Sequence, residues 1–153
     1  MSSTSCSIRN GMDEMNRLIA LLDSEDASLV VYNHGETRSF FKKGVRDLEY
    51  LLDHDPDFLS GALVADKVVG KASAGMLAFG GVKEVYARTL SSLAVPVLDK
   101  AGIACSYGTL VDHIIIPEGE KRCPLEKIVA DASEPAEIVS LLRAHFAEMN
   151  RIF

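Results

Sequence analysis

The chain has 153 residues, of which 48% are hydrophobic and 25% are charged, and its formal net charge is −6 at pH 7. A chain of this length buries roughly two-thirds of its unfolded surface, so a core can form without a disulfide or metal, and the composition excludes disorder as the main state. The negative charge excludes a general nucleic-acid-binding protein, because phosphate binding requires a positive surface.

The first third of the chain predicts a helix, a hairpin and a second helix. Apolar residues recur at helical spacing over residues 12–22 and again over residues 45–52. Between them, residues 28–33 and 36–41 are typical of strands, and Gly35 supplies the positive φ that a tight connecting turn requires. We therefore expect two antiparallel strands flanked by two helices.

The remainder alternates short apolar runs with helical segments. The expected strands are residues 61–65, 82–90 and 103–107, and the expected helices are residues 67–79, 93–100 and 133–153. Residues 111–116 are apolar but short, so this segment is compatible with either a strand or a helix. Strands that alternate with helices indicate βαβ units, so we expect an α/β protein with a partly parallel sheet covered by helices.

The sequence lacks the patterns of a membrane span and of a signal peptide, which bears on the number of domains and on the compartment. No run approaches the ~18 apolar residues of a membrane span, and the N-terminal stretch is polar where a signal peptide is apolar. We expect one cytoplasmic domain over residues 1–153, without membrane contact and with residues 1–10 flexible. The three cysteines, Cys6, Cys105 and Cys123, are odd in number and lack C-x-x-C spacing, which favours reduced thiols.

One segment breaks local rules and predicts the functional site. Residues 67–79 lack a broad polar face, yet Lys67 and Lys71 are four apart at the start of the predicted helix, where lysine opposes the helix dipole. We interpret Asp66 as the cap of a helix that starts there, with both lysines directed at a bound anion and Gly70 leaving room for it. A desolvated Lys67 or Lys71 would also serve as an acid, base or nucleophile. The alternative is that both lysines extend to solvent.

Familiar phosphate and metal motifs are missing. Gly70-Lys71 resembles the end of a P-loop, but Ala65 replaces its first glycine and Ala72 replaces its Ser/Thr. The chain also lacks H-E-x-x-H, G-x-S-x-G and a G-x-G-x-x-G that follows a strand. The four histidines are scattered and suggest no metal site, so we expect no metal and no cofactor.

Cys123 is a second catalytic candidate. Pro124 would open a short helix with Cys123 at its cap, where the helix dipole would lower the pKa of the thiol. In this hypothesis Glu126 assists thiol chemistry. The alternative is an inert thiol that fills a loop.

Two segments, VADKVVGKASAGMLAFGGVKEVYA over residues 64–87 and RCPLEK over residues 122–127, resemble a small bacterial family of uncharacterised function. Members of that family look like the cytidine-deaminase fold, which implies a three-layer α/β/α domain with a mixed sheet. Zinc deaminases carry H-x-E at the start of one core helix and P-C-x-x-C at the start of the next. In this chain the segments that correspond to these two motifs are residues 65–68 and 91–96. Neither segment supplies His or Cys ligands for zinc.

Three functional hypotheses follow. The first is a zinc-free, deaminase-like protein that binds a small anion, such as a nucleotide or phosphorylated metabolite, at the N-terminus of the helix starting at Asp66. The second is a non-catalytic interaction or regulatory module whose edge strand or C-terminal helix pairs with another subunit, which includes a homo-oligomer. The third is the thiol enzyme that uses Cys123. Whether the chain catalyses a reaction stays open at this stage.

Overall fold

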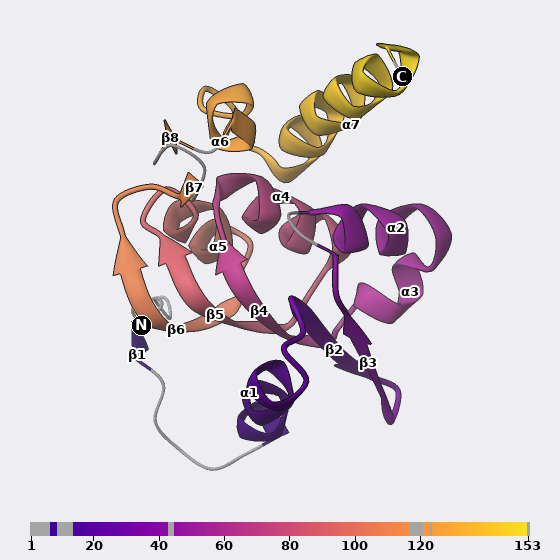
Figure 1. Ribbon diagram of the computed structural model, residues 1–153, viewed down its shortest axis with the longest axis vertical. Helices are drawn as coiled ribbons and strands as arrows, with labels where there is room; N and C mark the ends of the chain where they lie inside the picture. Colours follow the sequence, from indigo (N-terminus) through magenta and orange to yellow (C-terminus); the bar gives the residue numbers. More distant parts are fainter. Residues whose placement is uncertain (1–6, 9–13, 43–44, 117–120, 123, 153) are drawn as a thin grey trace.

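The computed structural model describes residues 7–8, 14–42, 45–116, 121–122 and 124–152. A six-stranded sheet in the order β1-β6-β5-β4-β2-β3 forms its centre, and β7 and β8 form a separate two-stranded ribbon (Figure 1). The strands are β1 (Ser7–Ile8), β2 (Leu29–Asn33), β3 (Glu36–Phe40), β4 (Leu63–Val69), β5 (Glu84–Ser91), β6 (Ala104–Val111), β7 (Ile115–Ile116) and β8 (Lys121–Arg122). The helices are α1 (Glu14–Ser24), α2 (Arg46–His54), α3 (Pro56–Leu59), α4 (Lys71–Gly80), α5 (Val95–Lys100), α6 (Pro124–Ile128) and α7 (Pro135–Ile152).

The sheet is mixed. Strands β4, β5, β6 and β1 run parallel, whereas β2 is antiparallel to both β3 and β4. Strands β2 and β3 are the predicted hairpin, and its two turn residues, His34 and Gly35, have φ values of 52° and 75°. Positive φ at both positions is the mark of a type I′ turn, whose twist matches that of the strands. Helices α4 and α5 provide the crossovers that parallel strands require, so the predicted mixed α/β sheet is confirmed.

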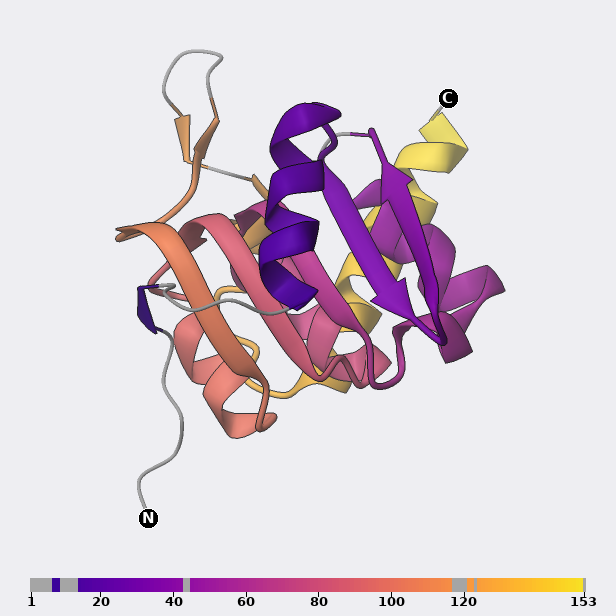
Figure 2. The same ribbon diagram turned by 90° about the horizontal axis from the view of Figure 1, so that it is seen from below.

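Helices cover both faces of the sheet, which confirms the three-layer arrangement. Figure 2 shows α1 on one face, while α4, α5, α2 and α3 lie on the other and α7 packs against α4. Each face has its own core. The smaller core joins Met15, Leu18 and Leu22 of α1 to Ala65 and Tyr86 of the strands, and the larger core fills the space between the sheet and the other helices.

The helix that was predicted to start at Asp66 starts instead at Lys71, with Gly70 as its N-cap. Residues 63–69 form β4, which pairs with β2 on one side and with β5 on the other. The prediction was wrong because a short apolar run has no periodicity that separates a buried strand from a buried helix. Pairing on both sides and the β-branched valines at positions 68 and 69 favour the strand.

Other boundaries differ less. Strand β6 continues to Val111 and residues 115–116 form β7, so the open stretch contains strand at both ends, with residues 112–114 between them in neither strand nor helix. The stretch after α2, for which no element was predicted, contains the one-turn helix α3, with Pro56 as its first residue. Helix α7 begins at Pro135, two residues after the predicted start at Ser133. Within the described part of the chain, no helix is long and apolar enough to cross a membrane.

The close packing of α7 on α4 depends on Gly75. A Cβ atom at Gly75 would lie 2.4 Å from Cγ2 and 2.7 Å from Cβ of Ile138, closer than carbon atoms pack. Ile138 is fully buried and its Cβ is fixed to the backbone of α7, so it cannot move aside without the helix moving. The absence of a side chain at Gly75 therefore sets the distance between the two helices.

We expect Gly75→Ala to lower the free energy of unfolding by about 1–3 kcal/mol, the usual cost of overpacking a core. This loss should exceed the gain of about 1 kcal/mol that alanine gives a helix interior. The Gly75→Ala, Ile138→Ala double variant should lose less stability than the sum of the two single variants, because removal of the Ile138 side chain makes room. Urea denaturation measures all three variants, and strictly additive losses would contradict the contact.

Candidate functional site

Asp66 caps no helix; it is a buried carboxyl group in the middle of β4. Only 8% of the residue is exposed, and its Oδ1 accepts the N–H of Val68 at 3.3 Å. Its neighbours across the sheet are Leu29 and Ala87, which both belong to the larger core. Burial raises the pKa of Asp66 to about 7, and the nearby charge of Asp47 acts in the same direction.

The two lysines do not converge on one point. Lys67 lies in β4, and its Nζ pairs with Asp26, which follows α1. Lys71 is the first residue of α4, and its Nζ donates to the carbonyl oxygen of Ala130 at 2.8 Å. Residues four apart are close neighbours only within one helix, so the late start of α4 removes the predicted pairing of the two ammonium groups.

The N-terminus of α4 nevertheless holds a carboxylate, which belongs to the chain itself. Glu126 of α6 is 1% exposed; its Oε2 accepts the N–H of Lys71 at 3.0 Å and its Oε1 accepts the N–H of Ile114 at 2.8 Å. A carboxylate here satisfies a free helix N–H and interacts favourably with the helix dipole. A Cβ at Gly70 would lie 3.0 Å from Oε2, so Gly70 leaves room for this carboxylate.

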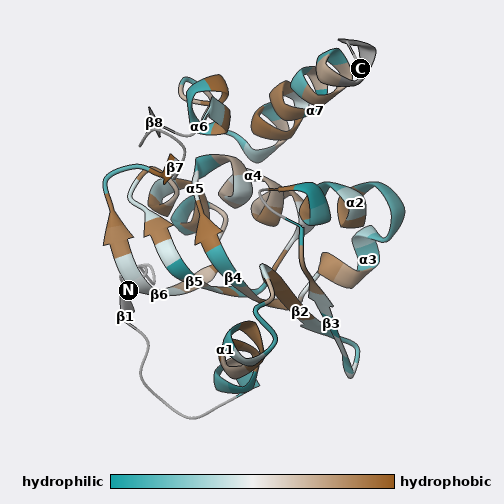
Figure 3. Ribbon diagram, in the orientation of Figure 1, coloured by the Kyte–Doolittle hydropathy of each residue, from teal (hydrophilic) through white to brown (hydrophobic). Residues whose placement is uncertain are grey.

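A cleft of about 380 Å³ opens at the carboxyl ends of β4 and β5. Val68, Thr89 and residues 111–115 line it. In Figure 1, β7 and α6 lie beyond the same end of the sheet, and Figure 3 shows that the ends of β4, β5 and β6 are hydrophobic. Ligands of open α/β sheets bind at the carboxyl ends of parallel strands. Ile114 belongs both to the cleft wall and to the contact with Glu126, so the two features adjoin.

Exposed apolar side chains gather at this end of the sheet. Val68, Leu110 and Ile115 are 44%, 46% and 54% exposed, and Val68 lies beside Thr89 in the register of β4 and β5. The polar side chains of the lining are Thr89, Asp112 and His113. A concave apolar surface with a few polar groups is the usual composition of a small-molecule site.

The residues at the starts of α4 and α5 do not fit a zinc ion. Gly70, Lys71 and Ala72 begin α4, and residues 91–96 before and within α5 contain no His, Cys, Asp or Glu. Zinc requires three or four ligands of these types. Among the residues that the structure describes, no three such side chains come together closely enough to hold a metal ion.

The cysteines give a mixed result. Cys105 of β6 is disulfide-bonded, so the prediction of reduced thiols is wrong at this position. Cys123, the predicted nucleophile, and Cys6 lie outside the described residues. Pro124 does open the short helix α6, but Glu126 directs both carboxylate oxygens at backbone amides rather than toward solvent. The thiol hypothesis stays a prediction.

Together the fold and the cleft define a three-layer α/β protein with a concave surface at the ends of parallel strands and an internally capped helix beside it. The chain belongs to the TM1506 family, a domain of unknown function (DUF1893), whose model matches residues 17–146. The predicted relationship to a small family of uncharacterised function is therefore confirmed.

Two solved structures are similar to this chain. The crystal structure of the DUF1893 family protein TM1506 from Thermotoga maritima has a TM-score of 0.80 and 24% identity, and the match covers 90% of this chain and 93% of that one. It shares the fold. A diaminohydroxyphosphoribosylaminopyrimidine deaminase/5-amino-6-(5-phosphoribosylamino)uracil reductase from Thermotoga maritima has a TM-score of 0.39 and 17% identity, over 61% of this chain and 35% of that one. That likeness is too distant to carry an argument. No functionally curated protein matches the chain.

The raised pKa of Asp66 predicts a pH-dependent stability. Between pH 4 and pH 7 the folded protein holds a proton on Asp66 that the unfolded chain releases, so the contribution of Asp66 to stability is greatest below about pH 4 and falls as pH rises toward 7. At ~1.4 kcal/mol per pKa unit, this loss is at most roughly 4 kcal/mol. Asp66→Asn should remove this decline and raise the free energy of unfolding at pH 8 by about 1–2 kcal/mol, less than the full amount because the amide must bury its N–H donors.

Urea denaturation at half-unit pH steps measures the effect. The matched control is Asp57→Asn, which removes an exposed carboxylate from α3 and should leave the pH profile unchanged. The difference between the wild-type and Asp66→Asn profiles isolates Asp66 from the other carboxyl groups. An Asp66→Asn profile that keeps the wild-type slope would show that Asp66 is ionised in the folded protein.

Proposed function

We propose that this chain is a zinc-free protein of deaminase-like fold that binds a small ligand in the cleft between Val68, Thr89 and residues 111–115. The observation that carries the proposal is the position of this apolar cleft at the carboxyl ends of adjacent parallel strands. Its volume of about 380 Å³ lies within the range of small-molecule pockets.

The lining favours a ligand with an apolar ring and hydrogen-bond donors over one dominated by phosphate. Val68, Ile114 and Ile115 supply apolar surface, while Asp112 brings negative charge that repels an anion. Neither lysine pairs with a group of the lining, since both ammonium groups have partners elsewhere. A nucleobase or nucleoside has the required chemistry. A phosphorylated ligand at the N-terminus of α4 would have to displace the carboxylate of Glu126.

Ligand binding is tested with a panel of nucleosides, the matching nucleotides and inorganic phosphate, by thermal shift and by amide chemical shifts of residues 111–115. Nucleosides should bind the wild type, and saturation near 100 times Kd should stabilise it by about 2.7 kcal/mol. Val68→Arg places a charged side chain at an exposed position in the cleft and should weaken binding at least about tenfold, since the arginine fills apolar space.

The control is Tyr50→Arg, which alters an exposed side chain on α2 and should leave binding unchanged. A panel that is inert toward the wild type would refute the cleft as a nucleoside site. Binding of inorganic phosphate that survives Val68→Arg would support the anion hypothesis instead.

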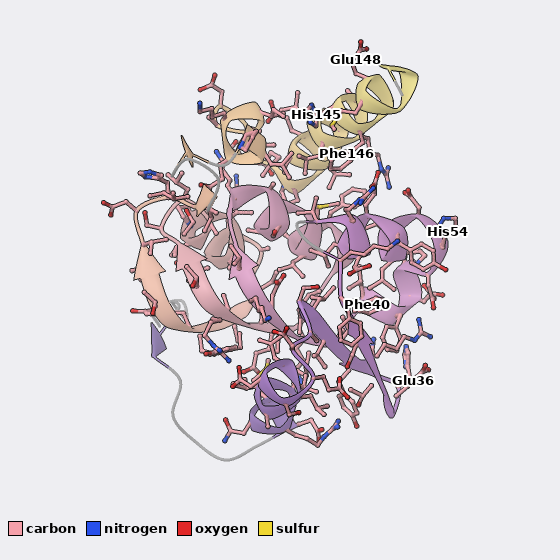
Figure 4. All side chains as sticks on the ribbon, viewed as in Figure 1. Glu36, Phe40, His54, His145, Phe146 and Glu148 are labelled. Atoms are coloured by element: carbon pink, nitrogen blue, oxygen red, sulfur yellow. The ribbon has the colours of Figure 1, made fainter. Side chains whose placement is uncertain are left out.

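A second candidate, pairing with another copy of the chain, is favoured by α7. Its inner part packs on α4 through Ile138 and Leu142, but Leu141 and Met149 are 38% and 43% exposed. In Figure 4 the labelled Phe146 lies on the side of α7 that faces the other helices, and Glu148 lies toward the outer end. Apolar residues of α7 are therefore present outside its contact with α4 as well.

Sedimentation velocity tests this candidate. If α7 pairs two copies, Met149→Glu should shift a dimer toward monomer, because a charge would enter an apolar contact. Ser140→Glu, a change at an exposed polar position of the same helix, is the control. A wild type that is monomeric at all concentrations tested would exclude this function.

A further inference from the structure

Glu126 connects three segments that are far apart in sequence. Its carboxylate lies between the first N–H of α4 and the N–H of Ile114, which precedes β7. The side chain of Ile114 also faces Gly70, since a Cβ there would lie 3.1 Å from its Cγ1. The cleft wall therefore meets the start of α4 at Ile114, and Glu126 is bonded to both.

The two partners of Glu126 differ in how firmly the rest of the molecule holds them. Helix α4 is embedded in the larger core, and Ala72 and Ser73 of its first turn are 3% and 7% exposed. The wall, residues 111–115, has little packing by comparison, since Asp112 and Ile115 are both exposed. The carboxylate of Glu126 accepts one N–H from this rigid helix and one from the wall, so it ties the position of the wall to the helix.

We propose that Glu126 is a latch that holds the cleft wall, residues 111–115, against the N-terminus of α4 and so sets the shape of the cleft. It is a positioning residue and does not contact a ligand. The inference rests on the proposed function only for the role of the cleft, because the latch itself is a property of the ligand-free protein.

The latch requires a carboxylate because two N–H donors converge on it. Each oxygen of Glu126 accepts one backbone N–H. A glutamine has one acceptor oxygen and one NH₂ group. At one of the two contacts its NH₂ group would therefore face a backbone N–H, and two donors cannot form a hydrogen bond. Glu126→Gln therefore breaks one contact at nearly constant side-chain volume, and Glu126→Ala breaks both.

Hydrogen exchange of single amides, followed by NMR on the full chain without ligand, tests the latch. In the wild type the Ile114 amide should exchange slowly although it lies outside a strand. Glu126→Gln should speed exchange at Ile114 or Lys71 by about tenfold or more, because hydrogen bonds to charged groups are among the strongest in proteins. Amides in the core, such as that of Val85, should keep their wild-type rates.

The control is Glu137→Gln, because Glu137 also accepts a backbone N–H, that of Ser133, but at an exposed position on α7. It should leave Ile114 unchanged. If Glu126→Ala does not fold, Glu126→Asp gives the same contrast, since its shorter side chain cannot span both amides. Unchanged exchange at Ile114 and Lys71 in every folded Glu126 variant, or an equal increase at all amides, would overturn the latch.

Ligand titration of the same variants separates the two proposals. If exchange at Ile114 or Lys71 responds to Glu126→Gln and no nucleoside binds the wild type, the latch holds and the ligand function fails. If nucleosides bind and exchange responds at neither amide, the ligand function holds and the latch fails. Both proposals together predict that Glu126→Gln changes nucleoside affinity although Glu126 does not line the cleft.

Discussion

The N-terminus of a buried helix has free N–H groups and a positive dipole, and in this protein the carboxylate of Glu126 accepts one of these N–H groups and offsets the dipole. The ammonium group of Lys71, which is unfavourable at the start of α4, extends away to the carbonyl oxygen of Ala130. The same carboxylate holds Ile114, so the capping of a core helix and the position of the cleft wall depend on one side chain.

The region beside α4 is thereby divided into a filled polar part and an open apolar part. Glu126 and Gly70 fill the polar part, where a Cβ at Gly70 would already crowd the carboxylate. The cleft is the open part, and its lining is mostly apolar. For the proposed ligand, this division favours recognition by shape and ring contacts. It differs from a metal centre, in which polar ligands converge on an open space.

Local patterns were enough to predict most of the fold. The hairpin was predictable because its turn chemistry is local, and α7 because Pro135 marks its first turn. The boundary between β4 and α4 was not predictable, because the apolar residues within 61–79 fit the spacing of a strand as well as that of a helix. Only the pairing with β2 and β5 shows where the strand lies. That boundary decided the functional interpretation, since it determines whether Lys67 and Lys71 share a face.

The predicted anionic ligand at the helix that carries Lys71 stays a prediction. The N-terminus of that helix is capped by a carboxylate of the chain itself, from a residue 55 positions further along. No pattern within the segment could indicate this. The sequence signal was Glu126 in the short helix opened by Pro124, which had been assigned only to the thiol hypothesis. Asp66 was interpreted as a helix cap, and its burial in β4 could not be inferred without the sheet.

The unequal cores on the two faces of the sheet have a consequence for how the molecule opens. Helix α1 is attached through a few apolar residues and the ion pairs of Asp23 and Asp26, whereas the opposite layer shares one extensive core. Cooperative units with few buried contacts open at lower free energy than the whole domain. We therefore expect α1 to be a separate unit of partial unfolding, whose release would expose Ala65 and Tyr86 while the layer that holds the cleft stays folded.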